Sequence, residues 1–169
     1  MTFLLDTNVL SDFFQARRHI ELATAARTVP CAIADVVRDE LAADSQRRKA
    51  FSAWLPTSNL DVVPILVGSA ADRVQLSIEI GLTTPRGKGE RAAIALAAAD
   101  PSFTFVAMDK GALWIALREL WTPGERLIGL PVFLRRLVDA GALEGNAADD
   151  VMAGSRHVMP TWWAAWRAG

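Results

Sequence analysis

The chain has 169 residues, of which 51% are hydrophobic and 22% charged, a composition that suits one globular domain with a full hydrophobic core. Its formal net charge of -1 excludes a general electrostatic attraction to nucleic acid, so such binding would need a local basic patch. The single cysteine, Cys31, excludes an internal disulfide framework and a cysteine-rich zinc site, and no apolar run is long enough to span a membrane, so we expect a cytoplasmic protein.

The N-terminal stretch joins a strand to a helix through an aspartate. The continuous apolar run 3–5 predicts a strand covered on both faces, and Asp6 follows it directly. Over residues 8–15 the apolar positions recur at helical spacing, and Thr7 can cap this helix. Ligands of parallel α/β sheets bind at the carboxyl ends of strands, which makes Asp6 a candidate site residue. The alternative is that Asp6 serves only as an N-cap, a common role for aspartate.

A second strand and a long helix follow. We expect a helix over 20–27, a strand over 29–34 and a helix over 36–55, which Pro56 ends. On the long helix, Glu40 shares a face with Val37 and Leu41. A carboxylate within an apolar stripe must be protonated, paired or bound to a cation, because burying a bare charge is too costly. Glu40 therefore needs a partner.

The middle of the chain predicts an edge strand, a helix and a flexible connection. The strand expected over 61–66 contains Pro64, whose missing N–H suits the margin of a sheet. A helix is expected over 68–80 and a connection over 81–89. The glycine and lysine spacing of that connection does not match a phosphate-binding loop.

Two further acids occur in contexts like those of the first two. Glu90 begins an alanine-rich helix on its buried stripe, although a glutamate there can also simply complement the positive helix N-terminus. Arg91 faces elsewhere, where it could reach a phosphate. The apolar strand 103–108 ends in Asp109, which repeats the pattern of the N-terminal stretch. We expect four acids to converge in one pocket at the carboxyl edge of the sheet: Asp6, Glu40, Glu90 and Asp109.

Strands alternate with helices five times along the chain. The fifth strand, 127–130, precedes a helix that begins at Pro131 and stops at Gly141. Nearly continuous apolar strands require a parallel sheet with helices on both faces. We therefore predict a three-layer α/β/α domain with a central, mostly parallel five-stranded sheet.

The C-terminal end differs in composition from the rest. We expect the α/β domain to cover residues 1–145, and residues 146–169 to form an acidic linker and a tryptophan-rich tail. Trp162, Trp163 and Trp166 would lie on one side of a short helix, which is marginally stable without a surface beneath it. The tail is therefore expected to dock on the domain or on a partner.

Four short segments carry the acids: Leu4-Leu5-Asp6-Thr7-Asn8, Val36-Val37-Arg38-Asp39-Glu40-Leu41, Gly89-Glu90-Arg91-Ala92-Ala93-Ile94-Ala95-Leu96-Ala97 and Val106-Ala107-Met108-Asp109. In order and context they resemble the PIN-domain ribonucleases and, more narrowly, the VapC-type toxins of toxin–antitoxin pairs. This resemblance implies that the first and fourth strands lie side by side, so that their terminal acids flank the point where the strand order reverses. Ala107 departs from many relatives, which carry a hydroxyl residue there.

The resemblance implies a metal-dependent endoribonuclease, and the residue types agree with that chemistry. Carboxylate oxygens without histidine or thiolate clusters suit Mg²⁺ or Mn²⁺. The expected metal ligands are Asp6, Glu90 and Asp109, and with Glu40 they form the expected catalytic set. The expected substrate contacts are Thr7, Asn8, Lys88 and Arg91. The expected partners are an RNA substrate, a cognate antitoxin and a second copy in a homodimer, with no membrane.

Two other functions fit parts of the pattern. One is a catalytically silent α/β module that binds RNA or a protein through the same pocket or the tryptophan-rich tail. The other is a phosphatase of the haloacid-dehalogenase type, which also begins with a strand that ends in an aspartate. That class needs a second acid two residues later, where this chain has Asn8.

Overall fold

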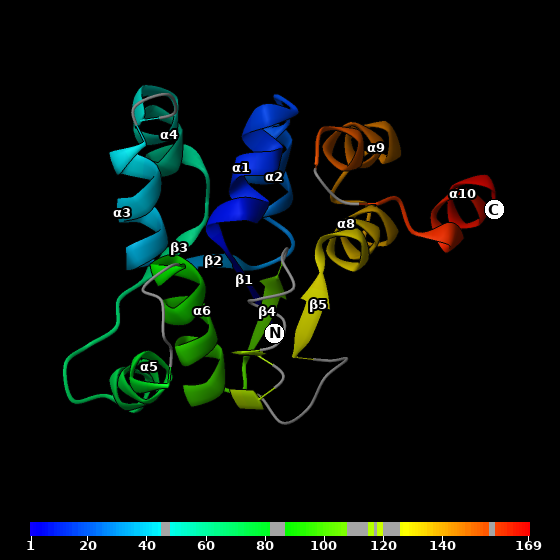
Figure 1. Ribbon diagram of the computed structural model, residues 1–169. Coiled ribbons are helices and arrows are strands. Elements are labelled where there is room, and N and C mark those ends of the chain that lie inside the picture. The colour runs from blue at the N-terminus through cyan, green and yellow to red at the C-terminus, as the bar shows by residue number, and fades with distance from the viewer. Residues whose placement is uncertain (45–47, 82–86, 108–114, 117, 120–125, 156–157) are drawn as a thin grey trace.

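Five parallel strands form the central sheet of the computed structural model, which describes residues 1–44, 48–81, 87–107, 115–116, 118–119, 126–155 and 158–169 (Figure 1). The strands are β1 (Thr2–Leu5), β2 (Cys31–Ala34), β3 (Asp61–Val63), β4 (Phe103–Ala107) and β5 (Leu127–Gly129). Their order is β3-β2-β1-β4-β5, and every neighbouring pair is parallel. The predicted fold class is confirmed, as is the adjacency of the first and fourth strands.

The edge strand β3 is shorter than the strand expected over 61–66. Its last residue, Val63, precedes Pro64, and β3 pairs only with β2 within the described sheet. Since proline cannot donate to a neighbouring strand, this position leaves no missing hydrogen bond between strands.

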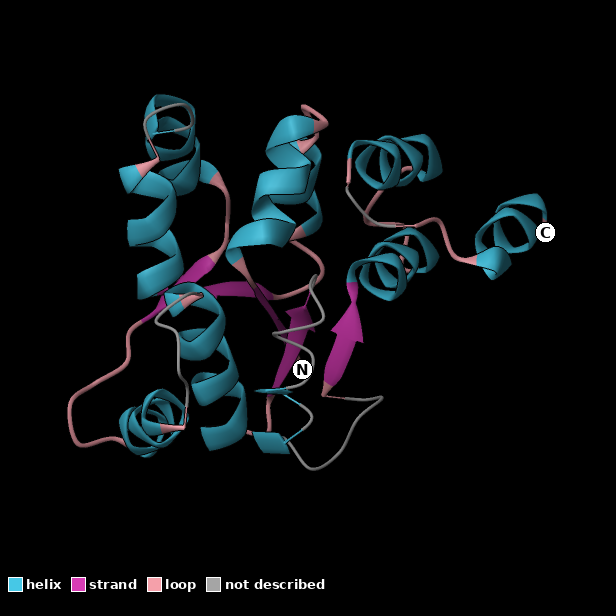
Figure 2. Ribbon diagram, viewed as in Figure 1, coloured by secondary structure: helices cyan, strands magenta, loops and turns pink. Residues whose placement is uncertain are grey.

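Helices cover both faces of the sheet (Figure 2). On one face, α6 (Lys88–Ala99) packs against β1, β2 and β4, and α5 (Ala70–Ile80) lies outside it. The other face carries α1 (Thr7–Gln15), α2 (His19–Ala25), α8 (Leu130–Asp139) and α9 (Gly145–Gly154). The structure also describes α3 (Asp35–Ala43), which packs against α6, α4 (Arg48–Trp54) with a 3-10 turn (Leu55–Thr57), and α10 (Thr161–Ala168).

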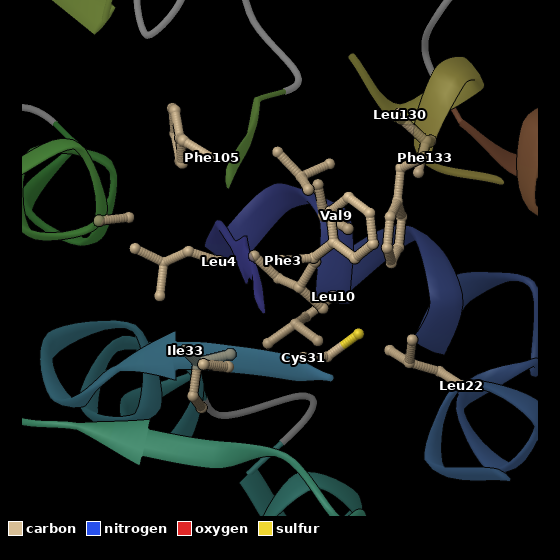
Figure 3. Packing of buried hydrophobic residues seen from close by; sticks show 14 of the residues in the cluster. Phe3, Leu4, Val9, Leu10, Leu22, Cys31, Ile33, Phe105, Leu130 and Phe133 are labelled. Carbon is tan, nitrogen blue, oxygen red and sulfur yellow. The ribbon is translucent and has the colours of Figure 1, made fainter. Parts of the chain in front are cut away.

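The hydrophobic core fills the space between the sheet and each helix layer. Phe3 and Leu4 point to opposite sides of β1, as successive strand residues must (Figure 3). Phe3 meets Phe133 of α8 with ring centroids 5.1 Å apart, and Leu4 is fully buried on the α6 side. Because β1 is covered on both faces, its C-terminal end is held rigidly.

Two predictions about the helices are wrong. The helix expected over 36–55 is two helices, α3 and α4, which lie on either side of residues outside the described part of the chain. The linker expected from residue 146 begins instead with α9, whose buried residues are Ala147, Ala148, Val151 and Met152. Counted from Ala147, the other three follow at one, four and five residues, a spacing that places all four on one side of a helix.

No helix in the described parts of the chain is both long and apolar enough to cross a membrane.

Candidate active site

The candidate site lies at the carboxyl end of β1, where the strand order reverses. The chain leaves β1 for β2 on one side and returns to β4 on the other. Loops at the two strand ends therefore diverge, and the space between them is where open α/β sheets bind ligands. Asp6, immediately after β1, occupies this place.

Asp6 is the N-cap of α1, as the alternative interpretation of the sequence predicts, and Thr7 is the first residue of the helix instead of its cap. Asp6 Oδ1 accepts a hydrogen bond from the backbone N–H of Val9 at 2.7 Å, and the Asp6 backbone is extended, with φ -84° and ψ 171°. The side chain has no exposed surface. Burying a carboxylate is costly, and an N-cap does its work equally well at the surface, so capping alone does not account for this burial.

Glu40 joins the N-terminal turns of two helices. Its Oε2 accepts a hydrogen bond from Thr7 Oγ1 at 2.5 Å, and its Oε1 accepts one from the backbone N–H of Gly89 at 2.9 Å. These are the partners that its position on an apolar stripe requires. Since both carboxylate oxygens are engaged, Glu40 fixes the start of α6 against the start of α1.

Gly89, which the sequence did not single out, allows this close approach. A Cβ atom there would lie 2.6 Å from Glu40 Oε2, 2.7 Å from Thr7 Oγ1 and 2.9 Å from Val37 Cγ2. All three distances are shorter than van der Waals contact. The signal available in the sequence was a glycine in the first turn of an otherwise alanine-rich helix, where glycine costs stability unless the space demands it.

Glu90 is brought to the same place by the turn that begins α6. Its Oε1 accepts a hydrogen bond from Asn8 Nδ2 at 3.2 Å, which links the first turns of α1 and α6. The N-cap of α6 is Gly87, with φ 72°, and a side chain there would collide with the Glu90 carboxylate. Glu90 is half-buried, and the neighbouring Lys88 is exposed.

Arg91 does not face solvent, contrary to the sequence-based expectation. It is 3% exposed, and its Nε lies 3.8 Å from Glu79 Oε1 on α5. Because α6 lies between the sheet and α5, both of its sides are covered. In this position the guanidinium holds α5 against α6 rather than contacting a phosphate.

The structure thus brings together Asp6, Thr7, Asn8, Glu40, Glu90 and Lys88, whereas Asp109 lies outside the described residues. Across the segments that the structure describes, no three histidine, cysteine, aspartate or glutamate side chains are grouped closely enough to hold a metal ion. The donors gathered here are oxygen atoms together with the Asn8 amide, which is the chemistry of hard cations such as Mg²⁺.

Comparisons with known proteins give one distant structural likeness. No protein-family model and no curated protein sequence matches the chain. Its structure is similar to a crystal structure of VapBC2 from Rickettsia felis bound to a DNA fragment from their promoter. The sequences are 18% identical, the match covers 76% of this chain and 98% of that chain, and the TM-score is 0.49. A likeness this distant assigns no residue and no activity.

Proposed function

We propose that the protein is a metal-dependent endoribonuclease that hydrolyses phosphodiester bonds of RNA. The observation that carries this proposal is the buried Asp6 at the switch point of the sheet, with Glu90 linked to the same turn through Asn8. The resemblance of the four acid-bearing segments to PIN-domain ribonucleases supports the same activity. Acids gathered where a sheet binds its ligands suit a substrate that approaches together with a cation.

Asp6, Glu90 and Asp109 are the residues we propose as ligands of Mg²⁺ or Mn²⁺. Held by these carboxylates, an ion would supply activation of a water molecule and charge stabilisation of the leaving oxygen. Oxygen donors without imidazole or thiolate ligands support this choice of metal.

The other residues of the site position these ligands and the substrate. Glu40 is a positioning residue, because its two oxygens already accept hydrogen bonds from Thr7 and Gly89. Asn8 orients the carboxylate of Glu90. Lys88 is exposed in the same turn and is proposed to contact a phosphate of the substrate.

We also propose that the protein is the toxin of a type II toxin–antitoxin pair, with a cognate antitoxin and a homodimeric state. The support is the resemblance to VapC-type toxins given by the sequence. A small reading frame just upstream, whose product binds this protein and suppresses its cleavage of RNA, is the expected finding. If co-expression of the neighbouring products gives no complex and no suppression, the toxin assignment fails while the nuclease activity still stands.

The test of the nuclease activity compares cleavage of single-stranded RNA in Mg²⁺, in Mn²⁺ and in EDTA. Asp6→Asn and Glu90→Gln are expected to lower cleavage by more than the roughly 10- to 100-fold that changes in outer partners of a metal cause. Asp39→Asn is the matched control, since it removes one carboxylate from an exposed position beside Glu40. It should cleave like the unmodified chain.

Cleavage that persists in EDTA, or in the Asp6→Asn variant, would contradict the metal-dependent mechanism. If RNA binds but no divalent metal supports its cleavage, the protein is better described as a silent PIN-like module that binds RNA.

A further inference from the structure

Residues of α8 and α10 form a pocket lined by two arginines and an indole ring. These two helices lie beyond the edge strand β5 (Figure 1). The volume of the pocket is about 430 Å³, and its walls are Val132, Arg135, Arg136, Asp139 and Trp162. Small-molecule sites span roughly 300–1,000 Å³, so the pocket has room for a group of the size of one nucleotide. It lies apart from Asp6, Glu40 and Glu90 at the starts of α1 and α6, which we call the acid cluster, and from the segments that resemble a known family.

Helix α10 is held in place by residues other than Trp162. Trp163 is 3% exposed, and its Nε1 donates a hydrogen bond to Asp149 Oδ1 of α9 at 2.8 Å. Trp166 Nε1 donates to Asp139 Oδ1 of α8 at 3.1 Å. These contacts place the half-buried Trp162 ring at the wall of the pocket without engaging its own N–H in the described structure.

The pocket carries a net positive charge beside this ring. The guanidinium carbon of Arg135 lies over one face of the Trp162 ring, 5.7 Å from its centroid, and over Trp166 at 5.9 Å, so a base would stack on the opposite face of Trp162. Arg135 Nε donates to Asp139 Oδ2 at 3.3 Å. Arg136 lies over the Phe3 ring at 5.8 Å and forms no ion pair with any described residue. The positive charges of Arg135 and Arg136 exceed the negative charge of Asp139 by one, and this excess is available to a ligand.

We propose that this pocket binds one nucleotide of single-stranded RNA, with its base stacked on Trp162 and its phosphate on Arg136. A flat ring next to fixed cations matches a planar base joined to a phosphate. An acidic peptide could satisfy the arginines but would leave the ring unused, and a duplex keeps its base faces covered. The proposal rests on the proposed function in naming RNA as the ligand.

The chemistry of the acid cluster explains why a second binding place is useful. Asp6 and Glu90 repel a phosphodiester when no cation is bound, and Arg91 is buried away from solvent. Lys88 is the exposed cation that we propose for this site, so further affinity for RNA would come from elsewhere on the surface. Helix α8 begins directly after β5, at the same edge of the sheet as the acid cluster, so a strand held on α8 can extend toward that edge.

The experiment measures RNA binding to the full chain in EDTA, because the acid cluster repels RNA when no divalent metal is present. The probe is a fluorescently labelled single strand of about 12 nucleotides, within the lengths that such sites cover, followed by anisotropy. The same sequence as a duplex, inorganic phosphate and poly-glutamate are the competitors. The single strand is expected to bind, and the duplex, phosphate and poly-glutamate to compete poorly.

Three variants test the residues of the pocket. Trp162→Ala should weaken binding by on the order of tenfold, the loss expected for one stacked base, and Trp162→Phe should recover part of it. Arg136→Gln should lower the slope of log affinity against log salt by about 0.7, the value for one phosphate contact on a single strand. Arg38→Gln is the matched control, because it removes an exposed arginine on α3 and should leave binding unchanged.

The outcomes separate this proposal from the nuclease activity. If the unmodified chain does not bind RNA in EDTA, or if Trp162→Ala and Arg136→Gln bind as it does, the pocket proposal is wrong even when Mg²⁺ supports cleavage. Full displacement by phosphate or poly-glutamate would also overturn it, in favour of an anion or a protein partner. Binding that depends on Trp162 in a chain without cleavage would support the pocket and refute the nuclease.

Discussion

Replacing Gly89 by alanine is expected to destabilise the protein, although alanine is the better helix former. The added Cβ would lie 2.6 Å from Glu40 Oε2 and 2.7 Å from Thr7 Oγ1. Either the neighbouring side chains are compressed, or Glu40 moves and loses its hydrogen bonds to Thr7 and to the Gly89 N–H.

The two opposing effects set the size of the change. Overpacking costs about 1–3 kcal/mol, and the same range covers the loss of a hydrogen bond to a charged group. The helix gains about 0.5–1 kcal/mol when glycine is replaced by alanine. The net loss is about 1 kcal/mol or somewhat more, which lowers the Tm of a domain of this size by roughly 2–4 °C.

The assay is thermal unfolding of the variant beside Gly154→Ala. At Gly154, the nearest atom to an added Cβ is Ala16 Cβ at 3.7 Å, an ordinary contact, so this control should keep or raise the Tm. Cleavage of RNA should fall in Gly89→Ala and stay unchanged in the control. A Gly89→Ala variant that is as stable as the unmodified chain would refute the close packing of α1, α3 and α6.

Substitutions at three other positions test separate parts of the structure. The Asp6→Asn variant should lose cleavage while its Tm holds or rises. The reason is that asparagine caps a helix as well as aspartate does and carries no buried charge. A lower Tm would show that the fold needs the carboxylate. In denaturant titrations, Glu40→Ala should lower the free energy of unfolding by about 1–3 kcal/mol. Glu40→Gln should recover most of that loss, since its amide can still form hydrogen bonds with both Thr7 and Gly89. Burial lowers the pKa of His19 below 6.5, so its neutral form is favoured in the folded state, and the stability it contributes is present above 6.5 and lost as the pH falls through the lowered pKa. His19→Phe should therefore flatten part of the fall in Tm between about pH 7.5 and pH 5, and an unchanged pH profile would contradict the burial of the imidazole.

The strands of the sheet could be predicted because each is encoded by a short local pattern of apolar and polar residues. A continuous apolar run predicts a strand buried on both faces, and the acid after it marks the end of the strand, as at Asp6. Pro64 likewise indicated that β3 lies at the edge of the sheet, although the strand ends before it and is shorter than expected. The order of the strands needed more than these local patterns, and the adjacency of β1 and β4 came from the resemblance to PIN domains.

The predictions for Arg91 and for the segment that forms α9 were wrong, because each rested on a single residue or on local composition. Arg91 was expected in solvent because it lies off the main apolar stripe, yet α6 has alanines on nearly all sides, which is typical of a helix covered on both faces. Helix α9 was missed because its acidic residues and glycines obscured the buried stripe that includes Val151 and Met152.

The partners of Glu40 could not have been predicted from the sequence, because they depend on three helices meeting within contact distance. An apolar stripe shows that a glutamate needs a partner, but the partner is 33 residues away in one case and 49 in the other. The contact is possible because Gly89, on α6, has no side chain. Such a site is encoded by the packing of the whole domain and not by any local motif.

The arrangement of helix N-termini explains how the fold gathers acids before any cation is present. Carboxylates brought together repel one another, which would favour separation of the elements that carry them. Here the N-cap Asp6 accepts a hydrogen bond from the N–H of Val9, and Glu40 accepts one from the N–H of Gly89. Glu90 lies in the first turn of α6. The partial positive charges at the starts of α1 and α6 lower the cost of holding these acids close together. An acidic site can therefore be part of the folded structure rather than a consequence of metal binding, and this is why loss of a neutral residue such as Gly89 should disturb it as much as loss of an acid.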